Sequence, residues 1–124
     1  MELSSTEIAK KIPDWDELTK ITDNISEIML KKMLLEKKIK AEEANIVYTA
    51  TVEPQYALNG KTPAISFIEA TYKYTGFKNE LLPLREEMAL LTSELEKARN
   101  RYEIFKQMLD IWRTVSANER NIKL

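Results

Sequence analysis

The 124-residue chain contains no cysteine and no histidine. Without cysteine it has no disulfides, no thiolate nucleophile and no thiolate metal ligand. Without histidine it lacks the most common general base and the imidazole ligand of metal sites. Both absences argue against a conventional enzyme. We therefore expect a non-enzymatic protein with no catalytic residues, no metal site, no cofactor and no small-molecule substrate.

Chain breakers and long apolar runs are also scarce. Only 2 glycines and 4 prolines occur, whereas 31% of the residues are charged. This composition is typical of long amphipathic helices rather than of a turn-rich β fold. The chain lacks an uncharged run of about 18 residues, and its N-terminal region has no basic segment followed by an apolar one. We expect a soluble, intracellular protein that does not enter a membrane.

Residues 1–13 are expected to form an N-terminal segment with one short helix. Ser4 followed by Glu7 has the spacing of a capping box, which opens a helix. Pro13 should end this helix near Ile12, because proline lacks the backbone N–H that a helix interior needs.

A long amphipathic helix is predicted over residues 14–53. Its apolar residues recur in steps of three and four, the period of one helix face. The helix should end before Pro54, because proline disfavours the α conformation in the preceding residue. The β-branched run 46–49 also fits a strand, but the chain has no second alternating run to pair with it. The face comprises Leu18, Ile21, Ile25, Ile28, Leu35, Ile39 and Ile46, with Lys32 and Glu42 interrupting it.

A turn over residues 54–62 is predicted to reverse the chain, and a short helix over 63–75 is expected to follow it. The pair Asn59-Gly60 is the strongest turn signal, because both residues tolerate a positive φ. Thr62-Pro63 has the pattern of an N-cap followed by proline in the first helical position. Gly76 should end this helix, because glycine is favoured just after a helix C-terminus.

The last helix, predicted over residues 79–118, carries the clearest apolar pattern in the chain. Pro83 is tolerated only in a first turn, which sets the start of the helix. Its apolar residues follow in steps of four and three, the a/d pattern of a coiled-coil heptad. They are Leu84, Met88, Leu91, Leu95, Ala98, Tyr102, Phe105, Leu109 and Trp112.

Charges beside the two apolar faces predict that the two long helices pair antiparallel within one chain. The expected register matches Glu43 with Arg85 and Lys38 with Glu94. Exposed pairs contribute only about 0–1 kcal/mol each, so they select the orientation more than they stabilise it. We therefore predict an all-α fold in a single domain, residues 1–124. It is a long, coiled-coil-like antiparallel helical hairpin with a short helix after the turn and a short N-terminal helix.

Basic residues accumulate in the last helix, although the net charge of the chain is −1. That net charge gives no general attraction to polyanions, so binding one requires a local patch. Lys106, Arg113 and Arg120 follow at seven-residue steps. The expected register places only Asn24, Glu17 or Lys10 opposite them. They should therefore form a basic edge with few acidic partners.

Such an edge has two interpretations. Arginine and lysine near aromatic residues can hold a phosphate backbone while bases stack on the rings. Alternatively, the rings are buried in the seam and the charges are merely solvated. Under the first interpretation, the candidate nucleic-acid-binding residues are Lys97, Arg99, Arg101, Lys106, Arg113 and Arg120.

Further apolar residues lie beside the seams, where two paired helices cannot cover them. A contiguous exposed apolar patch of several hundred Å² is rare on a monomer unless it serves an interaction. Either the short helices fold over these residues, or copies of the hairpin pack together, and we favour self-association. The candidate interface residues are Ile104, Met108, Ile111, Val115, Met29 and Met33.

The stretch LEKARNRYEIFKQMLDIWR, from Leu95 to Arg113, with Ser116-Ala-Asn-Glu-Arg120, resembles the C-terminal helix of small phage-encoded helical proteins. The nearest named family is the phage recombination mediators, UvsY-like. They are similar in length, in two long helices around a tyrosine- and glycine-containing middle, and in a basic final helix. The chain departs from them in its slightly acidic net charge. The resemblance implies a homo-oligomer that binds single-stranded DNA and loads a recombinase, in a bacterial or phage-infected host cytoplasm.

Two functions are therefore expected to compete. The first is an accessory protein that binds single-stranded nucleic acid, with DNA or a recombination or replication protein as partner. Its DNA affinity should fall steeply with salt, because binding releases counterions from the phosphates. The second is a helical structural, adaptor or inhibitor protein that acts through protein–protein contacts. Its affinity should survive high salt and depend on the apolar interface residues.

Overall fold

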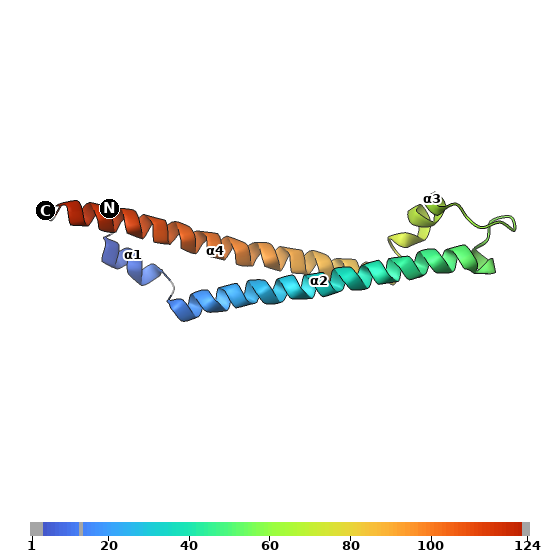
Figure 1. The fold of residues 1–124 in the computed structure, drawn as a ribbon, viewed down its shortest axis with the longest axis horizontal. Helices are drawn as coiled ribbons and strands as arrows, with labels where there is room; N and C mark the ends of the chain where they lie inside the picture. Colours follow the sequence, from blue (N-terminus) through green and yellow to red (C-terminus); the bar gives the residue numbers. More distant parts are fainter. Residues whose placement is uncertain (1–3, 13, 123–124) are drawn as a thin grey trace. The chain divides into compact units, whose positions relative to one another are not determined.

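The computed structural model describes residues 4–12 and 14–122. Within them, every named element is helical, which confirms the all-α prediction. The elements are α1 (Ser5–Lys11), α2 (Trp15–Val52), the 3₁₀ helix η1 (Pro54–Tyr56), α3 (Ile65–Ile68), the π-helical turn η2 (Glu69–Lys73) and α4 (Leu82–Ile122) (Figure 1). No helix in these residues is long and apolar enough to cross a membrane.

The chain divides into two compact units, each of which contains part of α2 and part of α4. We call residues 30–93 the loop unit, because they include the whole connection between the two long helices. We call residues 1–29 and 94–124 the terminal unit, because they include both ends of the chain. In each unit a segment of α2 accompanies a segment of α4 that lies far away in the sequence (Figure 1).

The two N-terminal helices begin where the capping residues predict. Ser4 Oγ accepts a hydrogen bond from the Glu7 N–H at 3.3 Å, and α1 ends at Lys11. Pro13, which was expected to end this helix, lies outside the described residues. The Asp14 side chain accepts from the Glu17 N–H at 2.8 Å, which caps the first turn of α2.

The seam of α4 is confirmed throughout its length, because each of its nine predicted residues is buried or half-buried. The seam of α2 differs at one position in the loop unit. Glu42, expected in the seam, is exposed, and Glu43 is half-buried in its place. A helix with 3.6 residues per turn drifts against a strict 3.5-residue repeat. The buried face therefore passes from Ile39 through Glu43 to Ile46, and Glu42 stays in solvent.

Residues 46–52 continue α2, so the helical interpretation of the β-branched run is confirmed. The predicted reversal is also confirmed. Asn59 and Gly60 have φ values of 53° and 76°, and Leu58 and Lys61 bond each other's backbone at 2.8 and 3.0 Å. Both central residues need a left-handed backbone, which asparagine and glycine adopt more readily than other residues.

The short helix after the turn is shorter and less regular than predicted. It was expected over 63–75 with Thr62 as its N-cap, but α3 begins at Ile65, after Ala64. Pro63 is buried in the loop unit instead of occupying a first helical turn. Beyond Ile68 the helix widens into η2, a π-helical turn. Long-range packing therefore overrides the local Thr-Pro signal.

The start of α4 is set by the backbone conformation of Asn79. Gly76 ends the preceding segment as predicted, with φ 88° and its N–H donating to Tyr72 O at 2.6 Å. The last helix was expected from 79 to 118 but runs from Leu82 to Ile122. Asn79 is left-handed, with φ 59°, so the helix cannot begin before it.

An aromatic cluster closes the loop unit near the connection. The rings of Tyr56 and Phe77 stack with centroids 4.4 Å apart, and Tyr72 lies edge-on to Tyr56 at 5.6 Å. Phe67 approaches Tyr72 edge-on at 6.3 Å. Because the four rings come from η1, α3, η2 and the residues before α4, they tie these segments together.

Candidate nucleic-acid interface

The six candidate basic residues all lie on α4 in the terminal unit, and all are exposed. Helix geometry divides them into two groups. Residues seven apart drift only about 20° around a straight helix, so four of the six share one side. Lys97 and Arg101 lie about 160° around the helix from Arg99, at roughly 100° per residue. We call the four-residue group the basic row: Arg99, Lys106, Arg113 and Arg120.

Lys97 and Arg101 occupy a different surface of the terminal unit. They line a shallow depression of about 180 Å³ together with Asn24, Ile28 and Glu94. Asn24 was expected opposite the basic row, but it lies on this other side. The assumed register had placed Asn24 on the wrong flank of α2, since it directly precedes the seam residue Ile25.

The basic row has acidic partners on its own helix, which were not predicted. Lys106 Nζ lies 3.9 Å from Glu103 Oε1, and an Arg113 guanidinium nitrogen lies 3.8 Å from Asp110 Oδ1. Comparing only facing helices misses such pairs, which are three residues apart along α4. All four side chains are more than half exposed. Pairs of this kind contribute little free energy, so a phosphate can compete for the cations.

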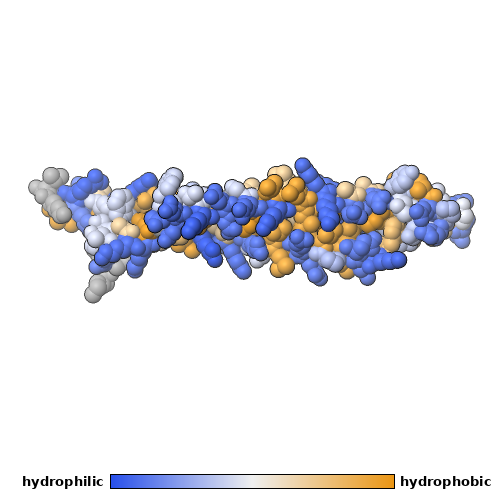
Figure 2. Space-filling view, turned by 90° about the horizontal axis from the view of Figure 1, so that it is seen from below, coloured by the Kyte–Doolittle hydropathy of each residue, from blue (hydrophilic) through white to orange (hydrophobic). Residues whose placement is uncertain are grey.

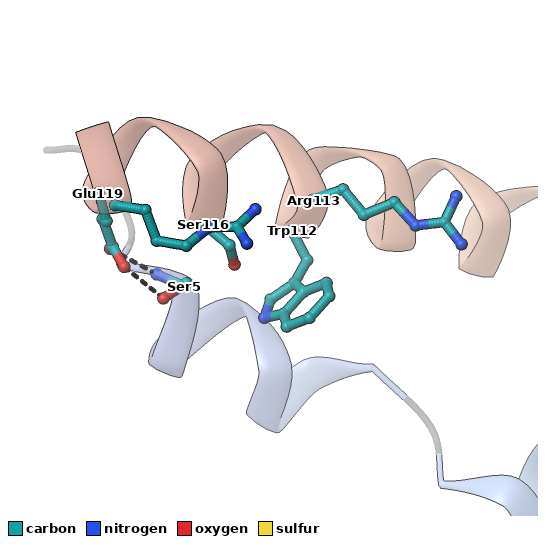
Figure 3. Close-up of a pocket in the computed structure, with 6 residues that line it drawn as sticks. Ser5, Trp112, Arg113, Ser116 and Glu119 are labelled. Atoms are coloured by element: carbon teal, nitrogen blue, oxygen red, sulfur yellow. Dashed lines mark hydrogen bonds between the residues drawn. The ribbon is translucent and has the colours of Figure 1, made fainter.

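The C-terminal half of the basic row borders a concavity of about 470 Å³ in the terminal unit, lined by Trp112, Arg113, Arg120, Ser5, Ser116 and Glu119 (Figure 3). The Trp112 ring projects toward α1, while the Arg113 guanidinium extends along α4 away from Ser5 and Glu119 (Figure 3). The concavity is therefore lined by one indole and by the side chains of two arginines.

The other side of this concavity is an N-terminal contact that the sequence did not predict. The backbone N–H of Ser5 donates to Glu119 Oε1 at 3.0 Å, and the Ser5 hydroxyl donates to Glu119 Oε2. Ile8 of α1 is buried. The two partners are separated by 114 residues and follow no periodic pattern. Since Glu119 accepts both bonds, its carboxylate is held toward α1.

The aromatic side chains of the terminal unit differ in how exposed they are to solvent. Tyr102, Phe105 and Trp112 are half-buried along the seam, while Trp15 is 78% exposed. Lys106 Nζ lies 5.9 Å from the centre of the Tyr102 ring. The three rings of α4 therefore pack in the seam, and Trp112 also borders the concavity.

The candidate interface residues are largely uncovered. Ile104 and Ile111 are each 53% exposed, and Met108 and Val115 in the same stripe are half-buried. Met29 and, in the loop unit, Met33 are also exposed. Hydrophobic surface is visible between hydrophilic side chains in Figure 2. The short helices therefore do not cover the two isoleucines, which leaves this stripe available to a partner.

The described residues contain no cluster of three or more acidic side chains placed to hold a metal ion. Comparison of the chain with models of protein families, with curated proteins and with solved structures gives no match. A functional interpretation therefore depends on the residues and their geometry.

Proposed function

We propose that this chain is a non-enzymatic, phage-like accessory protein that binds single-stranded nucleic acid through the basic row, as a recombination mediator would, and that acts as a homo-oligomer. The observation that carries the proposal is that Trp112, Arg113 and Arg120 line one concavity. Guanidinium groups hold phosphates, and an indole offers a face or edge to a base whatever its identity.

The charges around the concavity support this choice. From residue 97 to residue 122 the chain has six basic residues against three acidic ones. Each of those three carboxylates already has a partner: Glu103 has Lys106, Asp110 has Arg113 and Glu119 has Ser5. A local excess of positive charge thus accompanies the −1 charge of the whole chain.

The test compares two charge reversals on the same helix. Arg113→Glu/Arg120→Glu should weaken binding of a labelled oligothymidylate and make the slope of log affinity against log salt shallower by about 1.4, because two single-strand phosphate contacts are lost. Arg101→Glu, on the other side of α4, is the matched control and should have a smaller effect. Fluorescence anisotropy across a salt series gives both slopes, and circular dichroism verifies that the helices are retained.

A wild-type chain that ignores the oligonucleotide at low salt would refute the proposal. Equal losses for Arg101→Glu and for each single reversal in the basic row would refute the assigned site, because only non-specific charge would then matter.

A second candidate function is favoured by the uncovered stripe around Ile104 and Ile111. We propose that copies of the chain, or a partner helix of an adaptor complex, cover this stripe through apolar contacts. Ile104→Glu/Ile111→Glu should lower the mass measured by light scattering and leave the helical content unchanged. Val52→Glu, at a residue of α2 that is 52% exposed and so closely matches the two isoleucines in exposure, should not change the mass. A wild-type monomer at high concentration would contradict self-association.

A further inference from the structure

The loop unit contains a groove lined by residues of α2 and of η2, among them Glu43 of the α2 seam. Its larger part has a volume of about 550 Å³, and a smaller part of about 250 Å³ adjoins it through Glu43, Glu69 and Lys73. The floor consists of the α2 residues Ala44, Val47 and Thr51. We call the whole depression the loop-unit groove.

One wall of the groove is the π-helical turn η2. A turn of this kind leaves the regular hydrogen-bond ladder, and such turns are frequent at functional sites. Both side chains that η2 contributes to the groove, Glu69 and Lys73, are charged. Their ion pair is long, at 3.9 Å, and both side chains are at least 40% exposed. Lys73 can therefore exchange its partner for a ligand.

A fixed charge cluster lines the smaller part of the groove. One Arg85 guanidinium nitrogen donates to Glu43 Oε1 at 2.8 Å, and Nε donates to Tyr74 O at 2.6 Å. The guanidinium also lies 4.0 Å from the centre of the Tyr74 ring. These contacts occupy the Arg85 guanidinium, so it is not free to bind a ligand. It also neutralises the charge of Glu43.

The remaining groups at the rim suit an anion attached to a flat ring. Lys40 makes no ion pair with any described residue. Tyr48 is 67% exposed, so its ring is accessible to a ligand. Lys40, Lys73 and Arg85 outnumber Glu43 and Glu69 by one positive charge.

We infer that the loop-unit groove binds one nucleotide of a single strand, with the phosphate between Lys40 and Lys73 and the base against the Tyr48 ring. This inference rests on the proposed function, since it adds a second contact for the same class of ligand. The ammonium groups supply charge, and the exposed ring supplies stacking without sequence preference. The apolar floor formed by Val47 and Ala44 fits the edge of a base or a sugar.

The first experiment removes the two charges. Lys40→Gln/Lys73→Gln should weaken binding of the labelled oligothymidylate roughly 5- to 25-fold at about 0.1 M salt and make the salt slope shallower by about 0.7 to 1.4. Lys37→Gln/Lys61→Gln removes the same charge from exposed residues of the same unit that do not line the groove. This control should change the affinity less than twofold.

The second experiment uses the unaltered chain, so it does not depend on a variant that folds. An oligonucleotide with 5-bromouracil in place of thymine is cross-linked to the protein by light, and the adduct is located by mass spectrometry. We expect an adduct at Tyr48. Tyr48→Ala should remove this adduct and lower the affinity roughly 5-fold or more.

The outcomes separate this inference from the proposed function. If Arg113→Glu/Arg120→Glu weakens binding while Lys40→Gln/Lys73→Gln matches its control and no adduct forms at Tyr48, the groove is overturned and the basic row stands. If only the groove variants weaken binding, the groove stands and the basic row is overturned. A chain that does not bind the oligonucleotide overturns both.

Discussion

The loop unit and the terminal unit contain segments of the same two helices, yet they bury different amounts of apolar surface. Among the described residues, the loop unit holds seven of the eleven buried apolar side chains, including Ile68 and Leu81, and the terminal unit holds four. Only the loop unit has a segment between the long helices that folds back and adds its own side chains. We infer that the loop unit carries most of the stability.

Each unit contains an ion pair between an arginine and a carboxylate, but the two pairs differ in length and exposure. In the loop unit the Arg85–Glu43 pair is 2.8 Å long, with side chains only 22% and 20% exposed. In the terminal unit the Arg113–Asp110 pair is 3.8 Å long, with side chains 66% and 72% exposed. A short, half-buried pair fixes structure, whereas a long, exposed pair leaves its cation able to contact a ligand.

The largest expected effect tests the core of the loop unit. Ile68 is fully buried in the four-residue helix α3, so Ile68→Ala should lower the free energy of unfolding by about 2–4 kcal/mol through lost burial and a residual cavity. Ile65→Ala, three residues earlier and 66% exposed, should change it by less than about 0.5 kcal/mol. Urea unfolding followed by circular dichroism measures both.

The same substitution in the terminal unit sharpens the comparison. Ile8 is buried too, but it belongs to the seven-residue helix α1, which can detach without unfolding the remainder. Ile8→Ala should therefore lower the global free energy of unfolding less than Ile68→Ala and should speed amide exchange in α1. Equal losses at the two positions would remove the proposed difference between the units.

A smaller effect is expected from the Arg85 cluster. Arg85→Met keeps the length of the side chain but removes its bonds to Glu43 and Tyr74, so it should lower the free energy of unfolding by about 2 kcal/mol. Arg113→Met, which removes an exposed pair, should lower it by less than about 0.5 kcal/mol. If the two substitutions lower the free energy of unfolding equally, then the greater burial of the Arg85 pair does not make it more stabilising than the Arg113 pair.

Periodic features of the fold could be predicted from the sequence, and isolated long-range contacts could not. The seam from Leu84 to Trp112 and the match of Glu43 with Arg85 both follow from a repeat that extends over many residues. The π-helical turn and the late start of α4 depend instead on single backbone conformations, such as that of Asn79. No residue pattern specifies these in advance.

For the candidate site, we predicted six basic residues from the sequence, but not that they lie on two sides of α4. Lys97 and Arg101 lie on a different side of α4 from the basic row. This could have been predicted from the residue spacing at about 100° per residue. The contact of Ser5 with Glu119 and the loop-unit groove could not be anticipated, since each joins segments that share no pattern. Tyr48 gave no signal beyond its place in a β-branched run.

The smallest expected effect concerns the loop before α4. The pKa of the Glu80 carboxyl lies below its ordinary value, because its own backbone N–H and then that of Lys78 donate hydrogen bonds to the carboxylate. Phe77 N–H donates as well, at 3.0 Å. The carboxylate lies against Gly76, where the Cβ of any other residue would come within 2.4 Å of Glu80 Cδ.

This lowered pKa makes stability depend on pH in a defined direction. The charged form of Glu80 is favoured in the folded chain, so its contribution is complete above the unfolded-state pKa of about 4.3 and is lost as the pH falls through the folded-state value. Glu80→Gln should therefore destabilise the chain slightly at neutral pH, and the difference from wild type should vanish in acid. Urea unfolding at a series of pH values measures it. A difference that persists in acid would show that Glu80 acts through packing against Gly76 rather than through its charge.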